Sequence, residues 1–345
     1  MLGPDRSVHG GISGVVNGWY EAGIDKDIEL RYIATMREGS KLTKLFTAFG
    51  AYLEFGRCLK EYELVHANMA SDSSYLRKSV FIKKAFKKGK KIVIHQHGGE
   101  WIEYYKSLSE KKKQRVKDIF NMADRVLVLS PFHEDLFKNR IGIDAPITLF
   151  PNRISIPDEI TPIEHDGIRL LFLGRICRDK GIDELLEGVA EARKTYPDIH
   201  LCLGGIIEEA VYKEKIEKSD SFVSCLGWIG GKQKAEELRK CDIFIMPSYF
   251  EGQNVSVMEA MAFGRPVIAT DVGGTPMMIK DHETGILIEH QSAKAVSDAI
   301  CELLSDDSLR ANLGMKAREK AESDYNINRV VSDLRTVYEE ILSRK

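Results

Sequence analysis

Short apolar runs alternate with longer amphipathic stretches along most of this chain. Helix-like segments include residues 41–60 and 110–122. Strand-like runs fall at residues 30–34, 64–68, 92–95, 125–129 and 147–150, and again at 170–173, 201–203, 222–224, 243–246 and 267–269. Such an alternation is typical of parallel sheets whose strands are joined by crossover helices. The sequence therefore predicts an α/β fold with doubly wound parallel sheets.

The alternation is interrupted once, by a segment that contains Pro151, Pro157 and Pro162 and has no apolar periodicity. With 345 residues the chain suits two domains of roughly 150 to 180 residues each. We expect a first domain over residues 1–150, a linker over 151–166 and a second domain over 167–345, with the option that the last helix returns to the first domain. Only Met1 and Leu2 precede Gly3-Pro4, so the first strand is expected to be truncated or to start upstream.

Charge divides unevenly between the two halves. Residues 1–150 hold 25 basic and 18 acidic residues, whereas the remainder holds 25 basic and 34 acidic ones. The basic half indicates an anionic surface or substrate, and the acidic half argues against general nucleic-acid binding. No apolar run is long enough to span a bilayer and no signal peptide opens the chain, so a cytoplasmic location is expected. The six cysteines form no CxxC pair and are expected to be reduced, buried thiols.

The densest group of polar and small residues follows the apolar run at 243–246. Two glutamates within it, Glu251 and Glu259, are separated by seven residues. They stand among the sequences Glu251-Gly252-Gln253-Asn254-Val255, Ala260-Met261-Ala262, Gly264-Arg265-Pro266-Val267 and Gly273-Gly274. We expect this segment to leave a strand, form a loop and enter a helix near residues 254–256. The free N–H groups at that helix start would suit a sugar phosphate.

This signature resembles that of the retaining glycosyltransferases of family 4, whose GT-B fold has two Rossmann-like domains facing across a cleft. The resemblance is strongest over residues 170–288 and implies a nucleotide-sugar donor in the second domain and a saccharide or lipid-linked acceptor in the first. It implies that Glu251 holds hydroxyls of the donor sugar and Glu259 those of the ribose. The alternative for Glu259 is a helix capping box with Ser256. The family implication extends to neighbouring substrate contacts at Gly252, Gln253, Asn254 and Val255, although Gln253-Asn254 replace the more common Phe-Gly and leave the donor open.

A second motif, Gly174-Arg175-x4-Lys180-Gly181, follows the apolar run at 170–173. In family 4 the Arg and Lys of this pattern bind the donor pyrophosphate, which maps the role to Arg175 and Lys180. Fixed cations at that position stabilise a leaving diphosphate as its charge develops. Metal independence is then expected, and no other cofactor is implied. The alternative is that both cations are merely solvated.

Three further loops complete the site that the resemblance implies. His97, after the run at 92–95, corresponds to a family histidine that touches the donor sugar near the reacting carbon; a structural role is the alternative. Gly10 and Gly11, in the sequence His9-Gly10-Gly11, resemble the glycine-rich loop between acceptor and donor phosphate. Gly204, Trp228 and Ile229 would bracket the nucleotide base, and Trp228 could equally be a core aromatic.

Residues 77–91 carry eight cations and no acid, with apolar residues interleaved. A basic amphipathic helix of this kind can dock on anionic lipid, which would make the protein peripheral at the inner face of the membrane. A solvated helix face is the alternative. The eight cations are Arg77, Lys78, Lys83, Lys84, Lys87, Lys88, Lys90 and Lys91.

Asp25-Lys26-Asp27 superficially matches the metal-binding D-x-D of other transferases and is interpreted as a turn. The predicted function is transfer of a sugar from a nucleotide-diphosphate sugar, with UDP as the expected nucleotide, in cell-surface polysaccharide or glycolipid synthesis. A catalytically silent nucleotide-sugar-binding subunit is the alternative. A nicotinamide oxidoreductase is disfavoured because the G-x-G-x-x-G fingerprint is missing.

Overall fold

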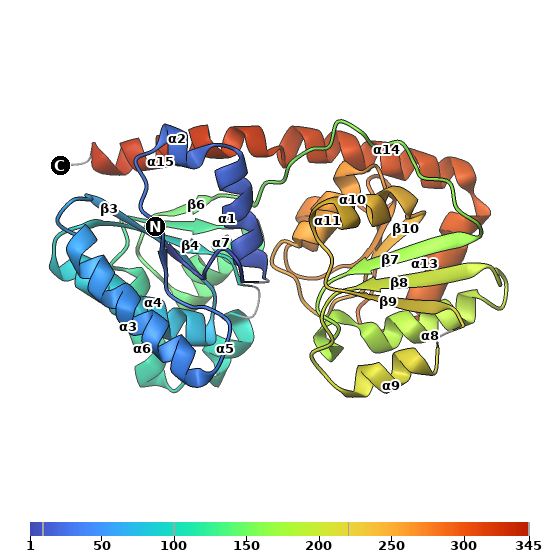
Figure 1. The fold of residues 1–345 in the computed structure, drawn as a ribbon, viewed down its shortest axis with the longest axis horizontal. Coiled ribbons are helices and arrows are strands. Elements are labelled where there is room, and N and C mark those ends of the chain that lie inside the picture. The colour runs from blue at the N-terminus through green and yellow to red at the C-terminus, as the bar shows by residue number, and fades with distance from the viewer. Residues whose placement is uncertain (9, 99–100, 220, 344–345) are drawn as a thin grey trace. The chain divides into compact units, whose positions relative to one another are not determined.

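The computed structural model of the chain describes residues 1–8, 10–98, 101–219 and 221–343, and it divides into two compact units. Unit 1 comprises Met1–Ile154 together with Ile327–Lys345, and unit 2 comprises Ser155–Asn326 (Figure 1). The sequence placed residues 167–345 in the second domain. It left open a return of the last helix to the first domain, and the structure assigns the part beyond residue 326 to unit 1, so the chain crosses between the units twice.

Unit 1 contains a six-stranded parallel sheet with the strand order β2-β1-β3-β4-β5-β6. Its central strands are buried on both faces, which explains their nearly continuous apolar sequences. The strands are β1 (Leu2–Gly3), β2 (Ile33–Ala34), β3 (Leu64–Met69), β4 (Lys91–Gln96), β5 (Arg125–Val128) and β6 (Ile147–Leu149). The opening strand β1 has only two residues.

Helices cover both faces of this sheet, with α1, α2 and α15 on one side and α3, α4, α5 and α6 on the other (Figure 1). Ser40 starts α3 by accepting a hydrogen bond from the Thr43 N–H at 3.2 Å. The helices are α1 (Gly11–Glu21), α2 (Ile24–Asp27), α3 (Lys41–Cys58), α4 (Asp72–Lys87), α5 (Trp101–Ser107), α6 (Glu110–Phe120), α7 (Pro131–Asp135), the π-helix η1 (Leu136–Ile141), the 3-10 turn η3 (Ile327–Arg329) and α15 (Val330–Leu342). The Asp25-Lys26-Asp27 sequence forms α2 rather than a simple turn, and Asp27 pairs with Arg335.

Helix α15 belongs to unit 1 through specific contacts. The Tyr338 hydroxyl lies 2.6 Å from Nδ1 of His66 on β3, and Arg125 of β5 pairs with Glu340 at 3.2 Å. The Ile327 N–H donates to the Ile154 carbonyl at 2.9 Å, where the chain re-enters the unit. Unit 1 is therefore assembled from two separate stretches of the sequence.

Unit 2 contains a second six-stranded parallel sheet, with the strand order β12-β11-β10-β7-β8-β9. Helix α8 packs with α13, and α11 packs with α14. The strands are β7 (Ile168–Leu173), β8 (Ile199–Gly204), β9 (Val223–Gly227), β10 (Ile243–Met246), β11 (Val267–Thr270) and β12 (Ile286–Ile288); the helices are the 3-10 turn η2 (Arg178–Lys180), α8 (Ile182–Ala192), α9 (Val211–Glu217), α10 (Gly231–Lys240), α11 (Val255–Ala262), α12 (Thr275–Met278), α13 (Ala293–Ser305) and α14 (Asp307–Asp324). The alternating pattern of the sequence thus yields two doubly wound α/β sheets, as predicted.

Two sequence expectations need correction. The six cysteines are free, but Cys225 is exposed rather than buried. The basic segment over residues 77–91 is not a uniform surface, because Lys78 is buried with 1 % exposure and Lys91 pairs with Asp124 at 3.3 Å. Within the described residues, none of the helices has the length and apolar character needed to cross a bilayer.

Candidate active site

The two motif segments of unit 2 follow neighbouring strands. Gly174 to Gly181 comes directly after β7, and Pro247 to Asn254 comes after β10, which pairs with β7. In the strand order β12-β11-β10-β7-β8-β9 the connections run in opposite directions from this pair. The carboxyl ends of β7 and β10 therefore form the topological switch point, where ligands bind in open α/β sheets.

Lys180 and Glu251 meet at this switch point. The Lys180 ammonium donates to Oε1 of Glu251 at 2.5 Å, and the Ser248 hydroxyl donates to the same oxygen at 2.7 Å. The side chains of Lys180 and Glu251 are only 14 % and 11 % exposed, so the alternative of a merely solvated cation does not hold for Lys180, whereas the Arg175 side chain is 50 % exposed. Both hydrogen bonds are made to Oε1 of the carboxylate, and neither of them involves Oε2.

Two glycines allow the loops to approach one another closely. Gly181 has φ +69°, and a Cβ added there would lie 2.0 Å from the Pro247 carbonyl oxygen. Gly273 has φ +56°, and its added Cβ would lie 2.0 Å from the Glu251 carbonyl oxygen. That same carbonyl accepts from the Gly274 N–H at 2.9 Å. Glycine is required at both positions because side chains would displace the Glu251 loop.

Helix α11 begins at Val255, within the range expected from the sequence. The Asn254 side chain caps it by accepting from the N–H groups of Ser256 at 2.8 Å and Val257 at 3.2 Å. The capping box between Ser256 and Glu259 is therefore wrong. Glu259 instead pairs with Lys234 on α10. Gly252 and Gln253 of the preceding loop are buried.

Lys234 was missed by the sequence analysis. It lies in the first turn of α10, the helix that follows the Gly227–Gly231 loop, and its pairing with Glu259 depends on how the two helices pack. Arg175 is more exposed and pairs with Glu208 at 2.9 Å. Arg175, Lys180 and Lys234 are thus each paired with a carboxylate.

The loops after β8 and β9 lie beside β7. A Cβ added at Gly204 would come within 2.6 Å of Leu173 and 3.1 Å of Ile229, so this glycine permits close packing. Ile229 is buried, whereas Trp228 is 53 % exposed. The core interpretation of Trp228 is therefore wrong, and its indole is accessible to a flat ligand.

The predicted residue of unit 1, His97, follows β4 directly. Its backbone N–H donates to the Met69 carbonyl at 2.7 Å, and Nε2 of its ring lies 2.8 Å from Oδ1 of Asn68 at the end of β3. The His95 ring lies 4.0 Å from this ring between centroids and stacks on Trp19 at 5.5 Å, and Trp19 and His97 are themselves 6.2 Å apart, so the three rings contact one another. Gly99 and Glu100, which follow His97-Gly98 in the sequence, lie outside the described residues.

Burial keeps these imidazoles neutral. Desolvation, aided by the nearby Lys78 charge, lowers the pKa of His97 to about 3. Desolvation likewise lowers the pKa of His133 to about 4 and holds the pKa values of His66 and His95 well below their usual range. His97 can therefore donate or accept a hydrogen bond without carrying charge at neutral pH.

Lys78 is a second residue that the sequence analysis did not single out. Its ammonium donates to the Ser74 hydroxyl at 2.7 Å, and Ser74 in turn accepts from the Ala70 N–H at 3.1 Å. Desolvation, followed by repulsion from Arg77, lowers the pKa of Lys78 to about 7. Its place in a cationic run concealed this burial.

Gly10 and Gly11 lie where α1 begins, after β1, and both are exposed. A Cβ added at either position meets no atom within 4 Å, so packing does not require glycine there. The space beside them is open to a ligand. His9, which precedes them in the motif, lies outside the described residues.

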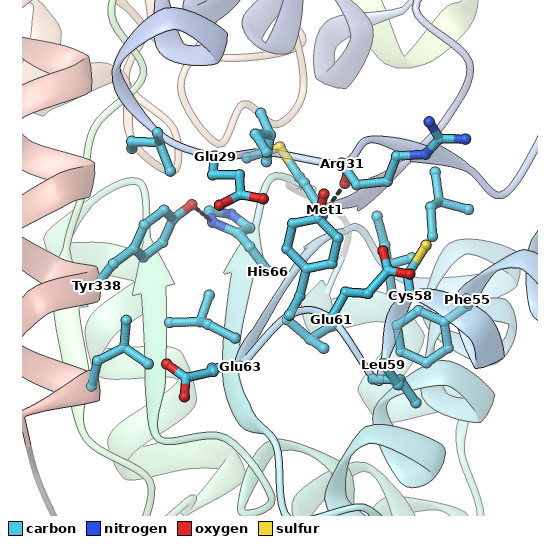
Figure 2. Close-up of a pocket in the computed structure, with 18 residues that line it drawn as sticks. Met1, Glu29, Arg31, Phe55, Cys58, Leu59, Glu61, Glu63, His66 and Tyr338 are labelled. Atoms are coloured by element: carbon cyan, nitrogen blue, oxygen red, sulfur yellow. Dashed lines mark hydrogen bonds between the residues drawn. The ribbon is translucent and has the colours of Figure 1, made fainter.

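The cavity shown in Figure 2 lies at the amino ends of the unit 1 strands, whereas His97, Gly10 and Gly11 follow carboxyl ends. It has a volume of about 470 Å³ and is lined by the amino ends of β1 and β3, the segment before β2 and α15. His66 and Tyr338 point toward one another across it, and the Met1 amine donates to the Arg31 carbonyl at 2.7 Å. The predicted site residues follow carboxyl ends of strands, so this cavity is not the candidate site.

Two family models match the sequence. The model described as Glycosyl transferases group 1 matches residues 156–320, and that described as Glycosyltransferase Family 4 matches residues 26–156. Together they cover most of both units.

Curated relatives include an uncharacterised glycosyltransferase of Methanocaldococcus jannaschii, 29 % identical over 64 % of this chain and 60 % of that protein. A D-inositol 3-phosphate glycosyltransferase of Paenarthrobacter aurescens is 30 % identical over 62 % of this chain and 56 % of that protein. The matches thus span less than two thirds of the length of these relatives.

Solved structures share the architecture. Sucrose-phosphate synthase from Thermosynechococcus elongatus superposes with a TM-score of 0.81 at 20 % identity, covering 100 % of this chain and 98 % of that one. Anabaena HepE, solved in complex with UDP and glucose, gives 0.77 at 15 % identity and covers 98 % of both chains. With two doubly wound sheets, the Glu251 and Glu259 signature after β10 and a family match to each unit, the chain belongs to glycosyltransferase family 4 and has the GT-B fold.

Proposed function

We propose that this protein transfers a sugar from a nucleotide-diphosphate sugar, with UDP as the nucleotide, to a saccharide or lipid-linked acceptor in cell-surface polysaccharide or glycolipid synthesis. The observation that carries the proposal is the Lys180 and Glu251 pair at the switch point of unit 2. A cation and a carboxylate held there match the two parts of such a donor, its phosphates and its sugar hydroxyls. The UDP and glucose bound to Anabaena HepE, which shares the fold, support this choice of donor.

In this proposal the donor replaces the carboxylates that now hold the cations of unit 2. Arg175 and Lys180 bind the pyrophosphate, and the phosphate oxygens take the places of Glu208 and Glu251. Glu251, released from Lys180, then accepts hydrogen bonds from the sugar hydroxyls. Glu259 exchanges Lys234 for the ribose hydroxyls, and Trp228 with Ile229 contacts the base.

The reaction proposed is retaining. The acceptor oxygen attacks the anomeric carbon from the face that UDP leaves, the bond from that carbon to the phosphate oxygen breaks, and the departing phosphate oxygen takes the acceptor proton. Arg175 and Lys180 stabilise the charge that develops on the diphosphate, which is why no metal is required in the proposal. His97, neutral by burial, donates its Nε2–H to Oδ1 of Asn68 and in this proposal accepts a hydrogen bond from a sugar hydroxyl at Nδ1.

The proposed acceptor site lies in unit 1, and the proposed donor site in unit 2. Free cysteines throughout the chain support a reducing, cytoplasmic setting. Gly10 and Gly11 leave open space where an acceptor and a donor phosphate could both approach the backbone.

The decisive experiment incubates the purified protein with UDP-glucose, UDP-galactose, UDP-N-acetylglucosamine and GDP-mannose, and measures both nucleotide binding and release of free sugar. We expect one UDP-sugar to be hydrolysed slowly, with chelator present, and with the α-anomer appearing first by NMR. Glu251→Gln should abolish hydrolysis and still bind UDP. Binding without turnover by the native protein would favour the silent subunit, and activity that requires manganese would contradict the metal-independent route.

A further inference from the structure

Helix α3 presents an apolar stripe to the outside of unit 1. The stripe consists of side chains at spacings of three and four residues along one side of the helix. They are Leu42, Leu45, Phe46, Phe49 and Leu53, which are 66 %, 65 %, 71 %, 61 % and 50 % exposed. A contiguous set of large apolar side chains this exposed marks an interaction site in a folded protein. We call these five residues the α3 stripe.

The opposite side of α3 is anchored in the core. Ala51, Phe55 and Leu59 are buried, and Phe55 packs edge-on against Phe81 of α4 at 5.3 Å between centroids. Lys84 of α4 also lies over the Tyr52 ring at 3.9 Å. The helix therefore has apolar residues on two sides, one satisfied by the core of unit 1 and the other facing outward.

Cations flank the α3 stripe on α3 itself and on the neighbouring helix α4. Helices α3, α4 and α6 lie on the same side of the sheet (Figure 1). The acidic residues of α3 and α4 are Glu54, which pairs with Arg31 at 2.5 Å, and Asp72. The exposed cations of α3 and α4 are Lys44, Arg57, Lys83, Lys87 and Lys88; α6, which packs on α4, adds Lys111, Lys112 and Arg115 but also the exposed acids Glu110 and Asp118.

We propose that the α3 stripe is a membrane-docking surface whose occupant is an anionic lipid bilayer. The stripe enters the interface between headgroups and acyl chains, and the flanking cations contact the anionic headgroups. A second copy of the chain fits less well, because an isologous contact would bring two cationic surfaces together. An anionic bilayer complements both the apolar and the charged parts.

This surface differs from the one that the charge run alone suggests. In the run over residues 77–91, Phe81 and Ala85 pack into the core and Lys78 is buried, so this side of the helix cannot insert; the exposed apolar residues of the run are Val80 and Phe86. Its outer cations instead form the rim of a surface centred on α3. The inference goes beyond sugar transfer and does not depend on the identity of the donor.

The position of the α3 stripe also connects it to the sheet edge that carries His97. Phe46 belongs to the stripe and, with Arg6 and Arg37, lines a cavity of about 430 Å³. That cavity lies where the chain leaves β1 and β2 at their carboxyl ends. Docking through α3 would hold this edge of unit 1 close to the headgroup layer.

The first test is co-sedimentation with vesicles of phosphatidylcholine alone and of equal parts phosphatidylcholine and phosphatidylglycerol. The protein should bind the anionic vesicles, and Leu45→Ser, Phe46→Ser and Phe49→Ser together should weaken binding by about tenfold or more. Lys83→Gln, Lys87→Gln and Lys88→Gln together should weaken it several-fold and reduce its salt dependence. The matched control replaces two exposed apolar residues of unit 2, Val211→Ser and Met315→Ser, and should bind as the native protein does.

The second test places a reporter in the stripe. In a Phe49→Trp variant the added indole should shift to shorter emission wavelength on anionic vesicles and be quenched by brominated acyl chains. Circular dichroism and UDP binding establish that each variant is folded. Since slow hydrolysis of a UDP-sugar needs no vesicle, failure of docking is distinguishable from failure of the proposed reaction. Sedimentation without quenching of the added indole's emission, or a lipid-free dimer that the triple serine variant abolishes, would overturn the proposal.

Discussion

The two units place very different chemistry at the carboxyl ends of their strands. In unit 2 the candidate residues are charged and held by opposite charges, as in the pairs Lys180 with Glu251 and Lys234 with Glu259. In unit 1 they are imidazoles that burial keeps neutral, with His97 and His95 in ring contact. The carboxyl ends of the strands in unit 2 thus carry ion pairs that a charged ligand can replace. Those in unit 1 carry uncharged groups that can form hydrogen bonds.

This difference assigns separate tasks in the proposed reaction. Neutralisation of the diphosphate falls to unit 2, because its cations can leave one anion for another at little electrostatic cost. Unit 1 instead orients uncharged hydroxyl groups. Lys78 is the exception. Burial lowers the pKa of this amine to about 7, so it is only partly protonated at neutral pH.

Loss of a phosphate cation should produce the largest effect on activity. Lys180→Ala removes the proposed pyrophosphate contact and should lower kcat/KM by about 100-fold or more, since stabilisation of a developing anion is commonly of that size. Steady-state hydrolysis of the UDP-sugar measures it. Lys232→Ala, which removes an exposed lysine from the same unit, is the control and should be silent. Similar losses in both variants would erase the special role given to the switch point.

Acid should destabilise unit 1 before unit 2. For His66, His95, His97 and His133 the folded pKa is depressed, so the unfolded chain binds protons first as pH falls below about 6.5. Stability is fully present above that pH and is lost on the way down to the folded values, near 3 for His97 and 4 for His133. Each histidine contributes a slope of about 1.4 kcal/mol per pH unit.

Urea unfolding at pH 7.5 and pH 5 measures this effect. Trp19 and Trp101, both buried, report on unit 1, and a Trp228→Phe variant removes the signal of unit 2. The histidines of unit 2 act less, because the pKa of His200 is lowered at a partly exposed position and that of His282 is raised by hydrogen bonding to Asp281. Equal shifts of both units between the two pH values would break the comparison.

The smallest effect is expected at Trp228. Its indole is half exposed, so Trp228→Ala should leave the fold intact and weaken UDP binding by a few-fold, the loss typical of one base-stacking contact. Calorimetric titration with UDP gives the affinity, and Trp228→Phe should restore most of it. If Trp228→Ala weakened the binding of inorganic pyrophosphate, which has no base, as much as the binding of UDP, the indole would not be contacting the base.

The sequence predicted what depends on order along the chain and missed what depends on packing. Glu251, Lys180 and the start of α11 could be located because strand ends, glycines and helix caps leave local signals. The partners Lys234 and Ser248 could not, because pairing distances arise only when the strands are placed side by side. The proposed roles of Glu251, Glu259 and His97 stay predictions.

Burial was the least predictable property. Lys78 stands in a run of cations, yet its helix turns this side chain inward. Conversely, residues 41–60 read as an amphipathic helix, and the pattern could not show that α3 has one apolar side for the core and another for the exterior. Which side of a helix faces the sheet is decided by its neighbours, here Phe81 and Lys84 of α4.

The return of α15 to unit 1 has a consequence for how the protein is made. Unit 2 is one continuous stretch, Ser155–Asn326, so all of it is translated before α15 is. Synthesis of unit 1 begins first and ends last, since the contacts of His66 with Tyr338 and of Arg125 with Glu340 form only after α15 has been made. Until α15 is added, the earlier-made sheet therefore lacks one of its covering helices, whereas unit 2 already has all the residues of its own core.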